Sequence, residues 1–142
     1  MTAKMAVVAH GGAGSGPARQ TNLQVAVDVA SKLLLSGASA VEAAVEACVI
    51  LEDDPVFNAG TGGVFRIDGS VLLDASIQTS DGRLGFVIAM KETPNPIRVA
   101  ADLLDHNING LTGDGARSWA DDKGHLRRHV DGRPPTEGDG DT

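Results

Sequence analysis

The feature that most constrains this chain is a glycine-rich run at residues 57–63, with the sequence FNAGTGG. Glycine adopts positive φ angles without steric cost, so such a run can turn tightly and aim main-chain N–H and C=O groups at a ligand or an ion. Asn58 adds one acceptor and two donors at the same place. The run joins a helix-like segment to a strand-like one, a common location for functional groups. By itself it is equally well explained by a turn without a function.

The composition is that of an ordinary globular chain with an acidic surface. Its 142 residues make one domain or part of one, with 42% hydrophobic residues and a formal net charge of −7. The negative charge argues against nucleic-acid partners and against anionic membranes. The apolar run at residues 5–9 is too short for a signal peptide or a membrane span, so a cytoplasmic location is expected. Cys48 is the single cysteine, and its apolar neighbours favour a buried, inert thiol.

Helical periodicity and end signals predict two long helices near the start of the chain. The first covers about residues 20–35, and the second covers about residues 40–52 after a capping box formed by Ser39 and Glu42. A third helix is expected to begin at Asn95-Pro96, with the asparagine as its cap, and to end near residue 106. A short helix is expected over residues 116–120.

Strand-like segments alternate with turn signals. Residues 5–9 form a continuous apolar run that predicts a buried strand. Residues 64–67 and 71–75 flank Asp68-Gly69, and residues 84–90 follow Asp81-Gly82; both dipeptides favour tight hairpins.

These elements predict an α+β fold in which helices are layered on a meander of antiparallel strands. The strands are too few for a complete two-sheet core. Residues 123–142 are dominated by Gly, Pro, Asp and Arg, which indicates a flexible linker after a body at residues 1–122.

Several motifs favour an unremarkable role over a catalytic one. The loop after His10 lacks the Gly-Lys-Ser/Thr ending of a phosphate loop and the dinucleotide-binding spacing, so a close packing turn and a structural histidine are favoured. His125 and His129 lack further ligands for zinc. The acidic residues 52–54 could bind a cation or solvate a helix end, although the helix dipole disfavours carboxylates at a C-terminus.

Three segments together resemble the plant-type L-asparaginases, also called isoaspartyl peptidases. They are HGGAG at residues 10–14, LEDDPVFNAGTGGVF at residues 51–65, and LDAS at residues 73–76 after Asp68-Gly69. NPIRVA at residues 95–100 and TGDGA at residues 112–116 also stand where this family has similar segments. The resemblance extends over most of the chain, and the segment around Asn58 is its most specific part.

The resemblance implies the α-subunit half of a four-layer αββα sandwich, the fold of the threonine-type N-terminal nucleophile hydrolases. It implies a precursor that cuts itself between Asp141 and Thr142, so that Thr142 becomes the first residue of a β chain. A threonine hydroxyl needs a base, and a free α-amine with a pKa of about 7.7–8.0 can serve. Asn58 then matches the family's asparagine that positions the nucleophile. The substrates implied are L-asparagine and β-aspartyl (isoaspartyl) dipeptides.

The same resemblance implies partners and an ion. In the family, a turn binds sodium through main-chain carbonyls, and carried over to this chain the carbonyls are those of Leu51, Glu52, Asp54, Phe57, Ala59 and Thr61. No cofactor is implied for the chemistry. The partner implied is a β-subunit from the same precursor, in an (αβ)2 heterotetramer, with no nucleic acid or membrane.

This chain also departs from the family pattern. The family's substrate-binding arginine and aspartate and its oxyanion-hole Thr-Gly pair belong to the β part, so this chain alone is expected to be inactive. The linker is also shorter than in the family. The alternatives are a non-catalytic remnant or binding module with the same glycine loops, or a lysosomal-type glycosylasparaginase, which shares the fold and follows the secretory route.

Overall fold

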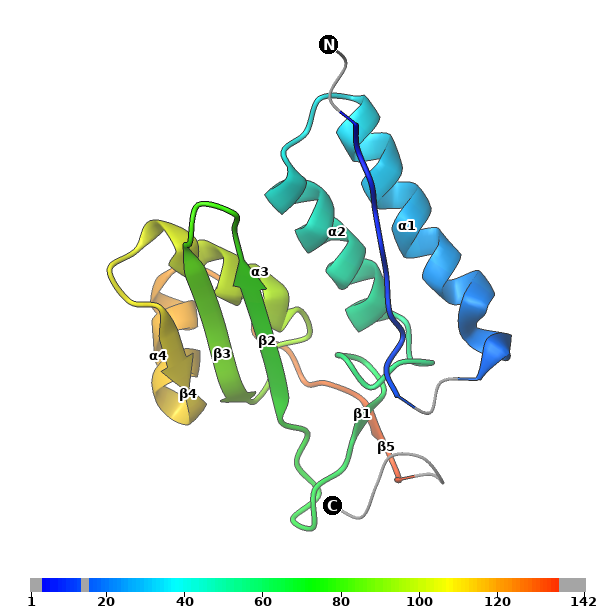
Figure 1. Cartoon of the computed structure of the whole chain (residues 1–142). Coiled ribbons are helices and arrows are strands. Elements are labelled where there is room, and N and C mark those ends of the chain that lie inside the picture. Colours follow the sequence, from blue (N-terminus) through cyan, green and yellow to red (C-terminus); the bar gives the residue numbers. More distant parts are fainter. Residues whose placement is uncertain (1–3, 14–15, 136–142) are drawn as a thin grey trace.

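The computed structural model of this protein describes residues 4–13 and 16–135, and it places two helices beside a small sheet. Figure 1 shows α1 and α2 side by side, next to β2, β3 and β4, with α3 and α4 behind these strands. The elements in chain order are η1 (Pro17–Arg19), α1 (Gln20–Leu35), α2 (Ala40–Asp53), β1 (Gly63–Val64), β2 (Leu73–Gln78), β3 (Leu84–Met90), α3 (Pro96–Asp102), η2 (Leu103–Asp105), β4 (Gly110–Thr112), α4 (Gly113–Asp122) and β5 (Gly132–Arg133).

The connection between α1 and α2 follows local capping rules. Gly37, with a φ of 94°, follows α1, and the N–H of Ala38 donates to the carbonyl of Leu33 at 3.0 Å. This is the hydrogen bond of a Schellman motif. The capping box then opens α2: the N–H of Glu42 donates to Ser39 Oγ at 3.1 Å, and the N–H of Ser39 donates to Glu42 Oε2 at 2.7 Å. Both long helices are confirmed.

The strands pair differently from the predicted meander. β2 and β3 form the expected antiparallel hairpin across Asp81-Gly82, but β4 lies parallel to β3, and β1 pairs in parallel with β5. Asp68-Gly69 does form a turn, closed by the N–H of Arg66 donating to the carbonyl of Ser70 at 2.8 Å. The strands on either side of this turn do not pair with each other, so the first predicted hairpin is wrong.

One face of the three-stranded sheet is covered by helices. Buried apolar residues of β3, α3, η2 and α4 make this core, namely Val87, Met90, Val99, Ala100, Leu103, Ala116 and Ala120. A Cβ at Gly85 would collide with the main-chain carbonyl of Ala100, so the sheet and α3 approach closely there. On the opposite face, Phe86 and Ile88 line an open hollow, and Ile88 is 48% exposed. The α+β class is confirmed, and one face of the three-stranded sheet is not covered by any described helix.

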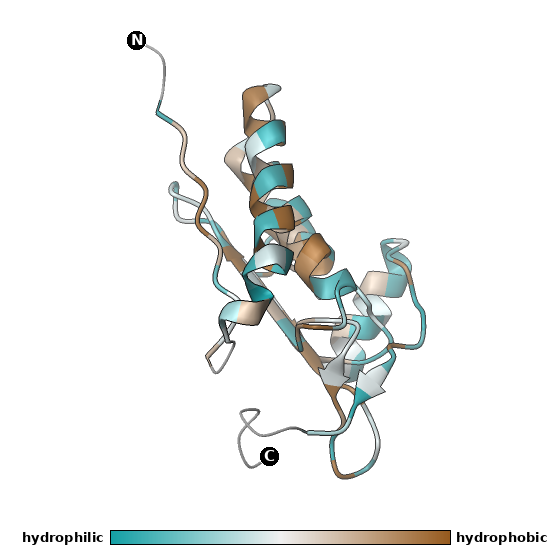
Figure 2. Cartoon of the chain, turned by 90° about the vertical axis from the view of Figure 1, so that its right-hand side faces the viewer, coloured by the Kyte–Doolittle hydropathy of each residue, from teal (hydrophilic) through white to brown (hydrophobic). Residues whose placement is uncertain are grey.

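The N-terminal apolar run is not the predicted buried strand. Residues 5–9 have no strand partner among the described residues, and Val8 is 92% exposed. Figure 2 shows this segment passing along the outside of the helices. Residues 6–9 of this segment line one pocket together with Ala30 and Ala43 of the helix pair. An apolar run indicates a tendency to be buried, but a strand also needs a neighbour to complete its hydrogen bonds.

Part of the segment expected to be a linker is packed, although most of residues 123–129 are exposed. Val130 is 4% exposed and clusters with Val71 and Leu73, while Gly132 and Arg133 pair with β1. Residues 136–142 lie outside the described residues, so the boundary after residue 122 stays a prediction. None of the described helices has the length and apolar character needed to cross a membrane.

A buried carboxyl group joins α2 to α3. The same two helices also meet in an apolar contact of Val45, Val49 and Ile97. Glu52 is 4% exposed, and its Oε1 accepts from the N–H of Ile97 at 3.0 Å, while its Oε2 is buried without a partner among the described residues. Burial is the main reason why the pKa of Glu52 rises from its ordinary value of 4.5 to about 8, and the hydrogen bond from Ile97 opposes part of this rise.

This raised pKa predicts that the free energy of unfolding decreases as the pH rises. The unfolded chain releases the Glu52 proton near pH 4.5, whereas the folded protein holds it until about pH 8. The stabilisation that Glu52 contributes is therefore complete below pH 4.5 and is lost towards pH 8. Over this range the free energy of unfolding decreases by at most about 1.4 kcal/mol per pH unit. Urea unfolding at several pH values measures the slope.

Glu52→Gln should flatten this dependence. Glu46→Gln is the matched control, because Glu46 lies on the same helix, is exposed and pairs with Arg98. A wild-type slope that survives in Glu52→Gln would contradict the assignment.

Candidate active site

Asn58 lies in the turn between α2 and β1, at the edge of a polar cavity of about 240 Å³. The residues that line the cavity are Asn58, Ala59, Val64, Arg66, Leu72, Leu73 and Asp74. The side chain of Asn58 is exposed and makes no hydrogen bond within the described part of the chain. Its acceptor and two donors can therefore serve a group that enters the cavity.

Main-chain hydrogen bonds fix the course of the glycine-rich run. The N–H of Thr61 donates to the carbonyl of Glu52 at 2.7 Å, which ties the run back to the end of α2. The N–H of Gly62 donates to the carbonyl of Asp131 at 2.8 Å, which ties it to the segment before β5. A Cβ at Gly60 would lie 2.7 Å from the carbonyl oxygen of Pro94, and Gly62 has a φ of 93°. Glycine is therefore required at both positions.

The three acidic residues before the turn each bind a different part of the fold. Glu52 accepts from the main chain of α3, as described above. Asp53 Oδ1 accepts from Asn95 Nδ2 at 2.9 Å, and Asp54 Oδ2 accepts from Asn22 Nδ2 of α1 at 2.7 Å. These bonds account for carboxylates at a helix end where the dipole disfavours them. They also correct one prediction: the Asn95 side chain binds Asp53 and makes no cap hydrogen bond to α3.

The residues expected to hold sodium lie at the end of α2 and in the turn. The last carbonyls of a helix have no partner within the helix. Here the carbonyl of Glu52 accepts from the N–H of Thr61 and that of Asp54 from the N–H of Phe57, so a cation would use the second lone pair of each oxygen. The carbonyl oxygen of Phe57 would lie 2.9 Å from a Cβ at Gly62, which places it on the inside of the turn. The carboxylates of Asp53 and Asp54 are engaged elsewhere, so a cation here would meet main-chain oxygens. This donor set fits a hard cation such as sodium.

The remaining residues singled out in the sequence are the presumed cleavage pair and the histidines. Asp141 and Thr142 lie outside the described residues. His10 Nδ1 accepts from the N–H of Gly12 at 3.1 Å, which agrees with a structural role. His125 contacts Asp102 at 3.0 Å, and no cluster of three or more His, Cys, Asp or Glu within residues 4–13 and 16–135 could hold a metal.

Two charged residues at the cavity were not predicted as site residues. Arg66 follows β1, and its guanidinium makes no hydrogen bond or ion pair with any described residue. Asp74 lies at an irregularity in β2, where its Oδ1 accepts from the N–H of Ala89 at 2.7 Å. The LDAS segment contains Asp74, but nothing in the sequence alone shows that it faces Asn58.

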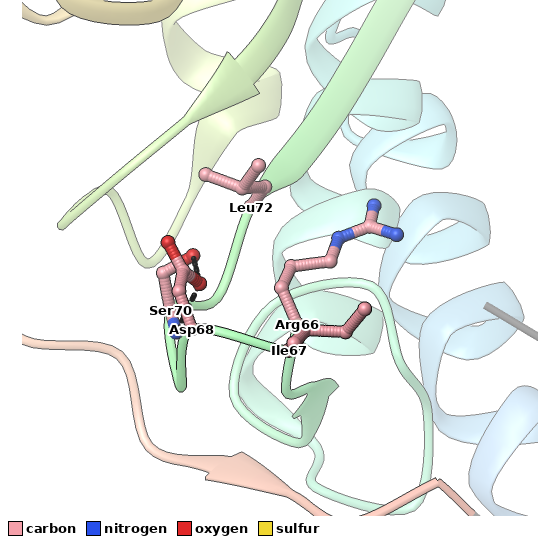
Figure 3. Close-up of a pocket in the computed structure, with 5 residues that line it drawn as sticks. All are labelled: Arg66, Ile67, Asp68, Ser70 and Leu72. Atoms are coloured by element: carbon pink, nitrogen blue, oxygen red, sulfur yellow. Dashed lines mark hydrogen bonds between the residues drawn. The ribbon is translucent and has the colours of Figure 1, made fainter.

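A second, shallower hollow adjoins the cavity. Figure 3 shows Arg66, Ile67, Asp68, Ser70 and Leu72 around the exposed turn, with Asp68 Oδ1 accepting from the Ser70 hydroxyl at 2.6 Å and from its N–H at 3.0 Å. Ile67 is fully exposed. Arg66 and Leu72 line both hollows, so the turn borders the cavity of Asn58.

Comparison with known proteins identifies relatives over most of the chain. The family profile described as Asparaginase matches residues 3–131. An isoaspartyl peptidase/L-asparaginase of Nostoc sp. is 43% identical over 66% of this chain and 32% of its own length. The mouse isoaspartyl peptidase/L-asparaginase is 36% identical over 84% of this chain and 39% of its own length. A plant-type L-asparaginase of Pyrococcus horikoshii is 39% identical over 82% of this chain and 40% of its own length.

The matched region is therefore at most about two fifths of the length of these relatives. The similarity includes the turn that carries Asn58 and the strands that border its cavity. The resemblance seen in the sequence is confirmed, and the chain belongs to the asparaginase family.

Proposed function

We propose that this chain is the α portion of an isoaspartyl peptidase/L-asparaginase that hydrolyses L-asparagine and β-aspartyl dipeptides. The relatives carry these activities in their names and are more than twice as long as the matched region. The observation that carries the proposal is the placement of Asn58. Its side chain is exposed in a polar cavity and makes no hydrogen bond with residues 4–13 or 16–135. Two glycines and several main-chain hydrogen bonds hold its turn in place.

In the proposed maturation step, the Thr142 hydroxyl attacks the carbonyl carbon of Asp141. The acyl group moves from nitrogen to oxygen, which breaks the peptide bond and forms an ester while the nitrogen becomes an amine. Water then hydrolyses the ester, returning the hydroxyl to Thr142 and leaving a carboxyl group on Asp141. The new α-amine can take the proton of the hydroxyl in later turnovers.

In the proposed reaction, the same hydroxyl attacks the side-chain amide of asparagine or the β-linked peptide bond of a dipeptide. Ammonia or the second amino acid leaves with the transferred proton, and water hydrolyses the acyl-enzyme to aspartate. Asn58 would hydrogen-bond to the nucleophile and hold it in line with the carbonyl, an alignment that contributes strongly to rate. The substrate-binding and oxyanion groups would come from the β portion, so this fragment alone would be inactive.

The open face of the sheet supports a β-chain partner. Helices cover only one face of β2 and β3, and the other face exposes Ile88 and half-buries Phe86. A second sheet packed there would complete the four-layer αββα sandwich, and two such units would form the (αβ)2 assembly. We further propose that sodium binds at the turn through the carbonyls of Leu51, Glu52, Asp54, Phe57, Ala59 and Thr61.

The first prediction is cleavage between Asp141 and Thr142. The gene should be expressed with its downstream region, and the intact mass should be recorded over time. Two fragments that meet at this bond, together with ammonia release from L-asparagine, are expected. Thr142→Ala should remain uncleaved because it lacks the hydroxyl. A wild-type protein that stays intact and inactive would favour a non-catalytic remnant or binding module.

The second prediction concerns Asn58→Ala in the complete protein. Loss of the alignment should lower kcat on the order of 100-fold while KM changes little. Asn107→Ala is the control, since Asn107 is exposed and does not line the cavity. Steady-state kinetics with a β-aspartyl dipeptide measure both constants, and an unchanged kcat would show that Asn58 has no part in the reaction.

The third prediction concerns sodium. An ion bound to the folded protein alone stabilises it by mass action. The melting temperature should be higher by about 2–4 °C in sodium chloride than in choline chloride at equal ionic strength. Equal melting temperatures in the two salts would count against a sodium site.

A further inference from the structure

We propose that Asn22, on α1, is a positioning residue that holds the Asn58 turn in its working geometry. This inference rests on the proposed function for its effect on catalysis. Asn22 lies in the first turn of α1 and is far from Asn58 in the sequence. Its Nδ2 donates to Asp54 Oδ2 at 2.7 Å, and both side chains are half-buried. This contact is a side-chain hydrogen bond between α1 and the segment that leads to Asn58.

Asp54 also forms hydrogen bonds with the first residues of the turn. Its second carboxylate oxygen, Oδ1, accepts from the N–H of Val56 at 3.0 Å, and its carbonyl accepts from the N–H of Phe57 at 3.1 Å. Rotation of the carboxylate would break either the bond to Asn22 or the bond to Val56. The orientation of the Asp54 side chain and the start of the turn are therefore fixed together by the amide of Asn22.

Phe57 anchors the other side of the same connection. Its side chain is 4% exposed, and a Cβ at Gly11 would lie 3.1 Å from Phe57 Cε1 and 3.2 Å from Leu23 Cδ1. The Phe57 ring therefore lies beside Gly11, which Leu23 also approaches. Asn22 binds Asp54 and the next residue of α1 borders the same glycine as Phe57, so a shift of this part of α1 is expected to disturb Asn58.

The amide of Asn22 has no competing role in the helix. The start of α1 has no side-chain cap hydrogen bond. A neutral amide donor also satisfies this carboxylate oxygen without adding a charge to the contact. The contact is therefore explained by its effect on the turn.

The same helix supplies a matched control. Gln24 Nε2 donates to Asp28 Oδ1 at 2.8 Å, which is also an amide–carboxylate bond, but it is exposed and lies within α1. Asn22→Ala and Gln24→Ala therefore remove the same kind of hydrogen bond, and only the first removes a bond to the turn.

The first measurement uses steady-state kinetics of the complete protein. Asn22→Ala should lower kcat about tenfold with KM nearly unchanged, because the nucleophile is aligned less well. Gln24→Ala should match the wild type. In an Asn58→Ala background, Asn22→Ala should lower kcat by less than about twofold, since residues that act through one contact are not additive. A role in general stability alone would give the same loss in both backgrounds.

The second measurement is independent of activity. Amide hydrogen exchange should be about tenfold faster at Val56 and Phe57 in Asn22→Ala and unchanged in Gln24→Ala. Unchanged exchange at these amides would overturn the inference, and so would an equal loss of kcat in both backgrounds. If the wild-type protein hydrolyses no substrate, the proposed function fails, and hydrogen exchange alone decides whether Asn22 positions the turn.

Discussion

The hydrogen bonds made by the C-terminal end of α2 are the interaction on which the rest of the candidate site depends. Three consecutive carboxyl side chains there reach the main chain of α3, the Asn95 side chain and the Asn22 side chain of α1. The main-chain carbonyl of Glu52 also accepts from Thr61, beyond Asn58. The turn is therefore held at both its ends by elements that pack independently of it. Such support is what a side chain needs to act from a loop with defined geometry.

The chemistry of these contacts explains their stability at a place where negative charge is disfavoured. Amide donors satisfy Asp53 and Asp54 without adding charge, and burial raises the pKa of Glu52 to about 8. Glu52 is therefore mostly protonated at neutral pH, and this reduces the electrostatic repulsion among the three neighbouring carboxyl groups. With these side chains engaged, the oxygens that face the inside of the turn are main-chain carbonyls. The same arrangement is compatible with the roles proposed for Asn58 and for these carbonyls.

Local signals in the sequence predicted the local structure well. Ser39 and Glu42 defined the start of α2, and Asp81-Gly82 defined the β2–β3 hairpin, because their partners are close in the sequence. Features that depend on distant partners were not predicted. The parallel pairing of β1 with β5 joins two segments that precede and follow the three-stranded sheet in the sequence. The Asn95 side chain binds a carboxylate of another helix instead of capping its own. The sequence predicted that Asn58 lies in a turn between a helix and a strand, but only the fold shows that Arg66 and Asp74 line the same cavity.

We propose that the turn after α2 presents Asn58 to a threonine nucleophile that becomes a chain terminus. A crystal structure of the complete, matured protein tests this most directly, through the distance between the Asn58 side-chain amide and Thr142 Oγ1. We expect a hydrogen bond of about 2.7–3.2 Å. A structure in which Thr142 is still joined to Asp141, or in which the two atoms lie more than about 6 Å apart, would contradict it.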